Sequence, residues 1–206
     1  MGDFEDIIDG VIDDSTEKLF SDASKTGAYM VQQAIKSALQ QDECGALNTI
    51  DHPHHEIHEG CYWFADDQSA SLASGAVKYW LFVTPNEDNF FHSFPQLYGT
   101  GEFEIQSYEN PTVATNGTEI PLLNRNRPLG GTTTHKFYKD PTGVNLTGAV
   151  KVRDIRVGAG KAIGESRSEN ELILKKNTKY LIVCTSRVAN CIISVHMNGY
   201  ICGIGG

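Results

Sequence analysis

From about residue 52 onward, short apolar and aromatic segments alternate with turn signals, and this succession constrains the fold more than any other feature. The segments are rich in β-branched and aromatic residues, which favour strands, and Gly, Pro and Asn pairs between them favour turns. No helical pattern intervenes, so the spacing predicts a mainly β, jelly-roll-like antiparallel β-sandwich over residues 51–206. Nine strands are expected: Cys61–Phe64, Val77–Val83, Phe90–Leu97, Glu102–Tyr108, Thr132–Tyr138, Ala149–Val157, Glu171–Leu174, Tyr180–Ser186 and Cys191–Met197.

Alternation within the strands predicts which side chains face the core, because successive residues of a strand point to opposite faces. Phe103 and Ile105 should point inward, and so should Ile193, Val195 and Met197. In the strand over residues 149–157 the apolar phase slips at Arg153-Asp154, which predicts a β-bulge there.

Residues 1–50 have a different pattern, with two one-sided apolar stripes at helical spacing. Helices this short are marginal in water, so their stripes need a partner surface. We therefore expect residues 1–50 to form an acidic helical arm that binds a partner protein, although packing of both helices on their own domain is the alternative. The stripes consist of Phe4, Ile7, Ile8, Val11 and Ile12, and of Val31, Ala34, Ile35, Ala38 and Leu39.

The charge of the chain is unevenly placed. The formal net charge is -9, and residues 1–59 hold 13 of the 26 acidic residues but only three basic ones. Binding to nucleic acid needs clustered Lys and Arg, so this distribution argues against it. An acidic arm suits a basic protein surface instead.

The five cysteines, the first residues and the apolar runs bear on the compartment. The cysteine count is odd and no C-x-x-C pair occurs, so free cysteines buried as small hydrophobes are expected, together with a reducing place of assembly. Residues 1–14 carry six acids and no basic residue, and the apolar runs are far shorter than the roughly 20 residues of a membrane span. We expect a soluble protein without signal peptide or membrane contact.

Four of the seven histidines lie between Asp51 and Glu59. On a strand, His54, Glu56 and His58 would share one face, a spacing from which a divalent metal could be bound. Three ligands on one strand rarely converge without a fourth, so we interpret the segment as a polar strand or linker that leads into the sandwich. No metal or cofactor is predicted, and metal binding or pH sensing by residues 52–58 stay alternatives.

The sequence shows no catalytic motif. The run from Val157 to Gly164 fails the phosphate-loop pattern, because Lys161 is followed by Ala162, and no G-x-S-x-G elbow occurs. We therefore predict that the protein is not an enzyme. Several aromatic residues could line a sugar-binding face, but in adjacent strands such residues are more often core. They are Tyr62, Trp63, Tyr79, Trp80, Phe90, Phe91 and Phe94.

The run His54-His-Glu-Ile-His-Glu-Gly60, followed by an aromatic strand, resembles the opening of a family of tailed-phage virion proteins. The resemblance spans roughly residues 54–200 in order. One departure is Cys61, which stands where members commonly have a polar residue. The other matching segments are Leu72-Ala-Ser-Gly75, Thr84-Pro85, Leu122-Leu-Asn-Arg-Asn-Arg127, residues 171–181, Thr185-Ser-Arg187 and Met197-Asn198.

Members of that family look like capsid decoration (cement) or minor head proteins with a jelly-roll-like domain, often trimeric. The resemblance therefore implies a non-enzymatic phage structural protein on the capsid surface of the virion, assembled in the host cytoplasm. Its expected partners are the major capsid protein, or another virion protein, and further copies of itself in a homotrimer or other homo-oligomer. The alternative is a receptor- or carbohydrate-binding module of a tail or fibre.

Overall fold

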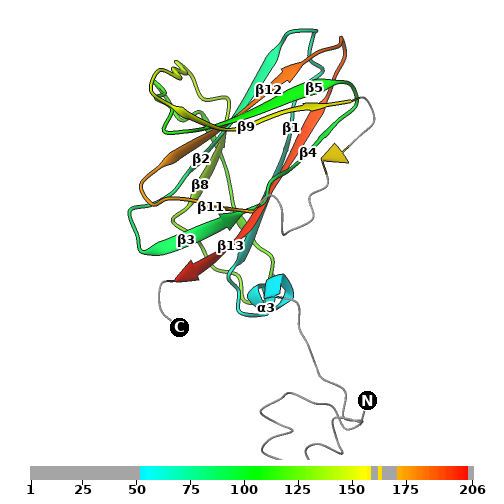
Figure 1. Ribbon diagram of the computed structural model, residues 1–206. Coiled ribbons are helices and arrows are strands. Elements are labelled where there is room, and N and C mark those ends of the chain that lie inside the picture. The colour runs from blue at the N-terminus through cyan, green and yellow to red at the C-terminus, as the bar shows by residue number, and fades with distance from the viewer. Residues whose placement is uncertain (1–51, 159–161, 164–170, 204–206) are drawn as a thin grey trace, which may run out of the picture. The chain divides into compact units, whose positions relative to one another are not determined.

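Two antiparallel β-sheets face each other and enclose a layer of apolar side chains (Figure 1). The computed structural model describes residues 52–158, 162–163 and 171–203, and these residues belong to one compact unit that begins at His52. Both predicted helical stripes, at residues 4–12 and 31–39, lie outside the described residues and stay predictions. None of the described helices is long and apolar enough to cross a membrane.

We name the sheets after their longest central strands. The β13 sheet runs in the order β10 (Ala162–Ile163), β4 (Gln96–Gly99), β13 (Ile193–Gly203), β1 (Tyr62–Gln68) and β7 (Leu123–Asn124), with β3 (Asn89–Ser93) beside β13 and β11 (Leu172–Ile173) beside β3. The β12 sheet runs in the order β6 (Thr118–Ile120), β8 (Lys136–Lys139), β2 (Val77–Val83), β12 (Lys179–Ser186), β5 (Phe103–Glu109) and β9 (Val150–Val157). One described helix, α3 (His52–His58), precedes β1.

The connections between the strands are those of a jelly roll. Along the chain, β1, β2, β4, β5, β9, β10, β12 and β13 alternate between the two sheets, except that β5 and β9 are neighbours in one sheet. The resulting orders, β1-β13-β4-β10 and β2-β12-β5-β9, form the double-sheet arrangement of eight-stranded jelly rolls. The predicted antiparallel jelly-roll-like sandwich is confirmed.

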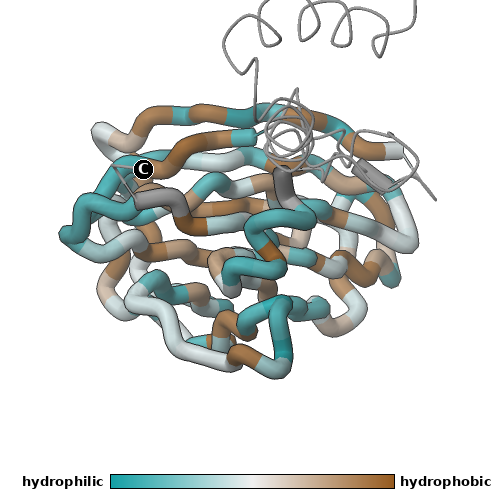
Figure 2. The backbone as a smooth tube through the Cα atoms, turned by 90° about the horizontal axis from the view of Figure 1, so that it is seen from below, coloured by the Kyte–Doolittle hydropathy of each residue, from teal (hydrophilic) through white to brown (hydrophobic). Residues whose placement is uncertain are grey.

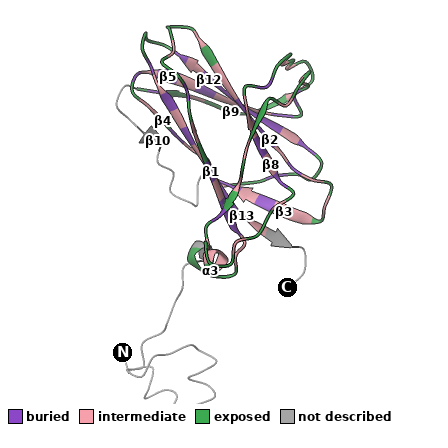
Figure 3. Ribbon diagram, turned by 180° about the vertical axis from the view of Figure 1, so that it is seen from behind, coloured by how far each residue is buried: buried purple, intermediate pink, exposed green. Residues whose placement is uncertain are grey.

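The core between the sheets is rich in aromatic residues. In strands with one face toward this core, such as the first half of β5, buried residues alternate with less buried ones; Figures 2 and 3 colour the chain by hydropathy and by burial. All five residues that were predicted to point inward are buried: Phe103, Ile105, Ile193, Val195 and Met197. Trp63, Trp80 and Phe91 also lie in this core, and Tyr62 and Phe94 are buried in a smaller cluster with Tyr200. The core interpretation is therefore confirmed for these five aromatic residues, which cannot form a sugar-binding face.

A second apolar cluster lies on the outer face of the β12 sheet. Leu81, Leu181 and Val183 are buried there. They are covered in part by the loop that precedes β6 and by the loop that follows β8 in the sequence. These segments are held together by bridges between Thr112 and Asn145 and between Thr115 and Thr142. Strands β2 and β12 are therefore buried on both faces, which explains why their sequences are nearly continuous apolar runs.

A largely buried carboxylate, with its side chain 10% exposed, links the two sheets. Asp67 in β1 accepts a hydrogen bond from Trp80 Nε1 of β2 at 2.8 Å and one from Lys139 Nζ of β8 at 3.3 Å. Lys78 Nζ lies 3.8 Å from the same carboxylate. Because a buried carboxylate is tolerated only when it is paired and hydrogen-bonded, these contacts explain an acid on the inward side of β1.

The strands differ from the prediction in several details: β6, β7 and β10 were not predicted, and β8 covers only Lys136–Lys139 of the segment predicted over Thr132–Tyr138. Two further differences have a clear local cause. The segment Phe90–Leu97 is two strands, β3 and β4, which pair with different parts of β13. The break follows from Pro95, which has no N–H to donate to a ladder. The predicted bulge in β9 is present but lies at Val152, since Ser107 pairs with Arg153 and Tyr108 pairs with Lys151.

Three cysteines among the described residues are free, and two of them, Cys184 and Cys191, are buried as predicted. Burial raises the pKa of the Cys184 thiol far above its ordinary value, so it stays protonated. Burial and the nearby Glu56 and Glu59 also raise the pKa of Cys61. The Cys184 thiol therefore lies in the core as a small apolar group.

Candidate functional site

The histidine-rich segment is a helix and not a strand, which corrects the predicted geometry of His54, Glu56 and His58. Pro53 suits the first turn of a helix, where its missing N–H costs nothing. Gly60 ends the helix with a φ of 73°, and its N–H and that of Cys61 bond the carbonyls of Ile57 and Glu56 at 3.1 and 2.9 Å. Pro53 and Gly60 are therefore sequence signals for a helix that the strand interpretation did not use.

The helix brings together two of these three residues. His54 and His58 are four residues apart and share a face, with their Nε2 atoms 2.9 Å apart and their ring centroids 4.7 Å apart. Glu56, two residues from each, turns away and is only 12% exposed, near His55 Nδ1 at 3.6 Å. Within the part of the chain that the structure describes, no group of three His, Cys, Asp or Glu side chains is placed to hold a metal.

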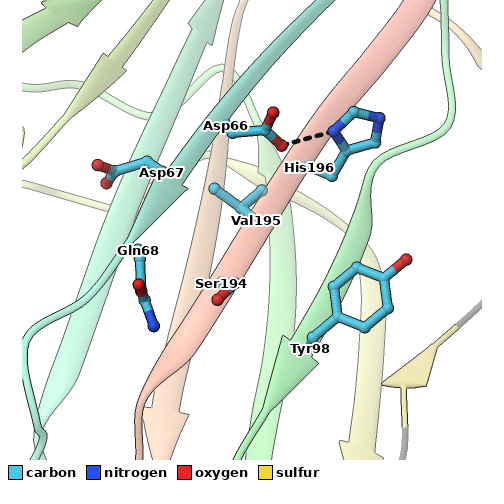
Figure 4. A pocket seen from close by; sticks show the side chains of 7 residues that line it. All are labelled: Asp66, Asp67, Gln68, Tyr98, Ser194, Val195 and His196. Atoms are coloured by element: carbon cyan, nitrogen blue, oxygen red, sulfur yellow. Dashed lines mark hydrogen bonds and ion pairs between the residues drawn. The ribbon is translucent and has the colours of Figure 1, made fainter.

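The outer face of the β13 sheet carries a shallow polar hollow. A hollow of about 530 Å³ lies over β1, β13 and β4, and its lining residues are Asp66, Asp67, Gln68, Tyr98, Ser194, Val195 and His196 (Figure 4). Its floor consists of alternate residues of neighbouring strands, because Asp66 pairs with His196, Gln68 with Ser194, and Ser194 with Tyr98. The hollow is therefore fixed by the sheet itself and not by a loop.

The central feature of the hollow is a carboxylate–imidazole pair. Asp66 Oδ1 lies 2.6 Å from His196 Nδ1, so Nε2 is on the opposite side of the ring. The Phe64 ring is 6.0 Å from the imidazole, and Tyr98 donates a hydrogen bond from its hydroxyl to Gln96 at 2.8 Å. Among the described residues no hydrogen bond joins Ser194 to His196. The arrangement offers hydrogen-bond donors and acceptors to a polar ligand.

A second imidazole–carboxylate pair lies on the same face, beside β3. Glu171 Oε1 is 2.6 Å from His92 Nδ1 and accepts a hydrogen bond from the Tyr200 hydroxyl at 2.6 Å. The His92 and Tyr200 rings are stacked, with centroids 4.5 Å apart and 17° between their planes. Tyr200 also belongs to the smaller cluster, against which Ile57 of α3 packs, so the surroundings of this pair include β3, β13 and the helix.

Sequence reasoning missed the residues of the hollow. The alternation that places Ile193, Val195 and Met197 inward also implies that Ser194 and His196 point outward. That much could have been predicted. The pairing of His196 with Asp66, 130 residues away, depends on strand register, which the sequence does not reveal.

The phosphate-loop-like run gains no support. Val157 ends β9, and Ala162–Ile163 form β10 at the edge of the other sheet. Residues 159–161 between them lie outside the described residues. The predicted partner-binding residues of the helical stripes lie outside them as well: Phe4, Ile7, Ile8, Val11, Ile12, Val31, Ile35 and Leu39.

Comparisons of the chain with known proteins identify no relative. No family model, no curated protein and no solved structure matches the chain. The chemistry that can be assigned to the molecule is therefore that of its own residues: a jelly-roll body with a polar hollow on one sheet and an exposed histidine pair on the helix before it.

Proposed function

We propose that the protein is a non-enzymatic structural component of a phage particle, which decorates and stabilises the capsid by binding the lattice of the major capsid protein. In this proposal residues 1–50 anchor the chain and the jelly-roll body projects from the shell. Copies assemble as a homotrimer or other homo-oligomer, so that several weak contacts act together.

The observation that carries the proposal is that the chain enters the described body at one of its two ends. Its first strand begins where its last strand ends: the Ile201 N–H donates to the Cys61 carbonyl at 3.0 Å, and Tyr62 pairs with Tyr200 (Figure 1). Helix α3, which follows residue 51, lies at the same end. A segment attached through α3 therefore joins the body at one end and leaves the far ends of both sheets away from the attachment point.

Two further features support the proposal. Eight-stranded jelly rolls occur in viral capsid and lectin domains, although a fold alone does not determine a function. The resemblance of residues 54–200 to tailed-phage virion proteins favours a role in the capsid over a role as a lectin. The net charge of -10 that residues 1–59 carry suits a basic docking surface on the shell.

The experiment is cryo-electron microscopy of phage particles with and without this protein. The proposal predicts extra density on the outer surface of the head, at symmetric positions, with the size of one jelly roll per copy. Density on the tail or fibre instead would favour the second candidate function, and unchanged particles would rule out both.

The hollow on the β13 sheet favours one second candidate, a glycan-binding module. A volume of about 530 Å³ falls within the range of roughly 300–1,000 Å³ that is common for small-molecule sites. Tyr98 is 39% exposed and offers a ring face beside the polar groups of Asp66, Gln68 and His196. Sugars are bound by this combination of an aromatic surface with hydroxyl-binding side chains.

This candidate predicts saturable glycan binding by the full chain on a glycan array. Asp66→Ala and Tyr98→Ala should each weaken binding at least about tenfold, since each removes a contact worth more than about 1.4 kcal/mol. Leu129→Ala, an exposed change outside the hollow, is the matched control and should bind as the unmodified protein does. Equal binding by all variants would exclude the hollow as the site.

A further inference from the structure

The exposed pair His54 and His58 has a geometry that the proposed function does not use. The two side chains come from successive turns of α3, and their Nε2 atoms approach to 2.9 Å. Both residues are exposed, whereas neighbouring Glu56 is turned away with a side chain only 12% exposed. Two imidazole nitrogens thus lie next to each other at the surface of the helix.

Without a metal, this contact can only be a hydrogen bond in which one ring donates its Nε2–H to the bare Nε2 of the other. Imidazole is a good ligand for divalent transition metals, and the bare nitrogen is the atom that binds. A metal ion bound to both Nε2 atoms would close one turn of the helix, and the ring that donated its Nε2–H would then carry that proton on Nδ1 instead.

The distance between the two Nε2 atoms favours one kind of metal ion over another. With metal–nitrogen bonds of about 2.0–2.1 Å, two nitrogens that are 2.9 Å apart subtend an angle of about 90° at the metal. That angle belongs to neighbouring positions of a square-planar or octahedral ion, the geometry of Cu²⁺ and Ni²⁺. A tetrahedral Zn²⁺ would need the nitrogens to separate to about 3.3 Å.

We propose that His54 and His58 form a bidentate surface site for a divalent transition metal that prefers tetragonal geometry, Cu²⁺ or Ni²⁺ before Zn²⁺. No third His, Cys, Asp or Glu of the described residues converges on the pair, so the other positions of the ion are taken by water or by donors of another molecule. The site is independent of the proposed function, since it rests on the local geometry of α3 alone.

Binding would also stabilise α3. A helix of seven residues is marginal by itself, because few backbone hydrogen bonds repay the cost of its first turn. A metal that bridges residues four apart holds that turn in place and shifts the equilibrium by mass action. Because α3 follows residue 51 directly, the ion would stiffen the beginning of the body.

The test is isothermal titration of the full, tag-free chain with Ni²⁺, together with electron paramagnetic resonance of the Cu²⁺-loaded protein. His55→Ala is the matched control, because His55 lies in the same helix but beside Glu56 and outside the pair. We expect one site per chain whose affinity falls at least about tenfold in His54→Ala and in His58→Ala, since loss of even an outer-shell partner costs about 10–100-fold.

The spectroscopic result separates chelation from nonspecific binding. The Cu²⁺ signal should show coupling to two equatorial nitrogens in the unmodified protein and in His55→Ala, and to fewer in the other two variants. Circular dichroism checks that all variants are folded. The proposal is overturned if no saturable site is found, if all variants bind alike, or if His55→Ala weakens binding as much as the paired variants do.

Discussion

At the scale of single residues, His135 is the clearest conflict between a side chain and its surroundings. It is 1% exposed and lies among core aromatics, with its ring centroid 5.3 Å from that of Phe91 and 6.0 Å from that of Phe82. Thr133 Oγ1 is 3.2 Å from its Nδ1, but its Nε2 has no hydrogen-bond partner among the described residues. Burial lowers the pKa of His135 to about 4, although Glu87 opposes the shift.

This residue predicts a loss of stability in mild acid. The unfolded chain binds a proton at this histidine below pH about 6.5, whereas the folded chain does so only near pH 4. The free energy of unfolding should therefore fall as the pH drops from about 6.5 to 4, by about 2–3 kcal/mol between pH 7 and 4.5. Urea unfolding at both values measures it.

The control is His135→Phe, which places an apolar ring of similar size in an aromatic site and cannot be protonated. Its free energy of unfolding should change less between pH 7 and 4.5 than that of the unmodified protein, by those same 2–3 kcal/mol. An identical decrease in both proteins would assign the acid sensitivity to other groups.

At the scale of elements, β12 shows how a jelly roll can contain a strand with two buried faces. Ile182 and Cys184 point into the core between the sheets, while Leu181 and Val183 point into the cluster on the outer face. The sequence of β12 was correctly predicted as a strand from its apolar run. The second cluster could not be predicted, because the loops that cover it precede β6 and follow β8, tens of residues away from β12 in the sequence.

If the outer cluster is a true core, Leu181→Ala should destabilise the protein about as much as Ile182→Ala does. Deletion of such buried side chains costs about 2–5 kcal/mol, partly through the cavity that remains. Leu123→Ala in β7, where the side chain is 39% exposed, is the control and should cost less than about 1 kcal/mol. If the urea unfolding midpoint of Leu181→Ala is as high as that of Leu123→Ala, the loops over the outer cluster do not form a packed core with Leu181.

Helix α3 and the β3–β4 break show where local sequence patterns were insufficient. Pro53 and Gly60 are helix boundary signals, but the alternation of His54, Glu56 and His58 also fits a strand, and seven residues are too few for periodicity to decide. At Phe94-Pro95 the apolar run continues through a proline, which in a central strand should have ended the predicted element. In both segments, Pro and Gly were better guides than apolar spacing.

At the scale of the whole molecule, strand content and inward-facing residues were predictable from the sequence, whereas the site was not. Alternation determines which residues point outward, but the hollow requires Asp66, Tyr98 and His196 to come together from three strands. Such pairings arise from register and topology, which are set by long-range contacts. The predicted acidic arm over residues 1–50 lies outside the described residues and stays a prediction.

The proposed function requires that residues 1–50 anchor the body to a phage head. The body is the compact unit that begins at His52. The most direct measurement compares incorporation of the full chain and of residues 51–206 into particles that lack the protein, with circular dichroism and thermal melting to check that the shorter chain is folded. We expect the full chain on the purified heads and the folded shorter chain in the unbound fraction. Equal incorporation of both chains would contradict the proposed anchoring role of residues 1–50, because the body alone would then bind the capsid.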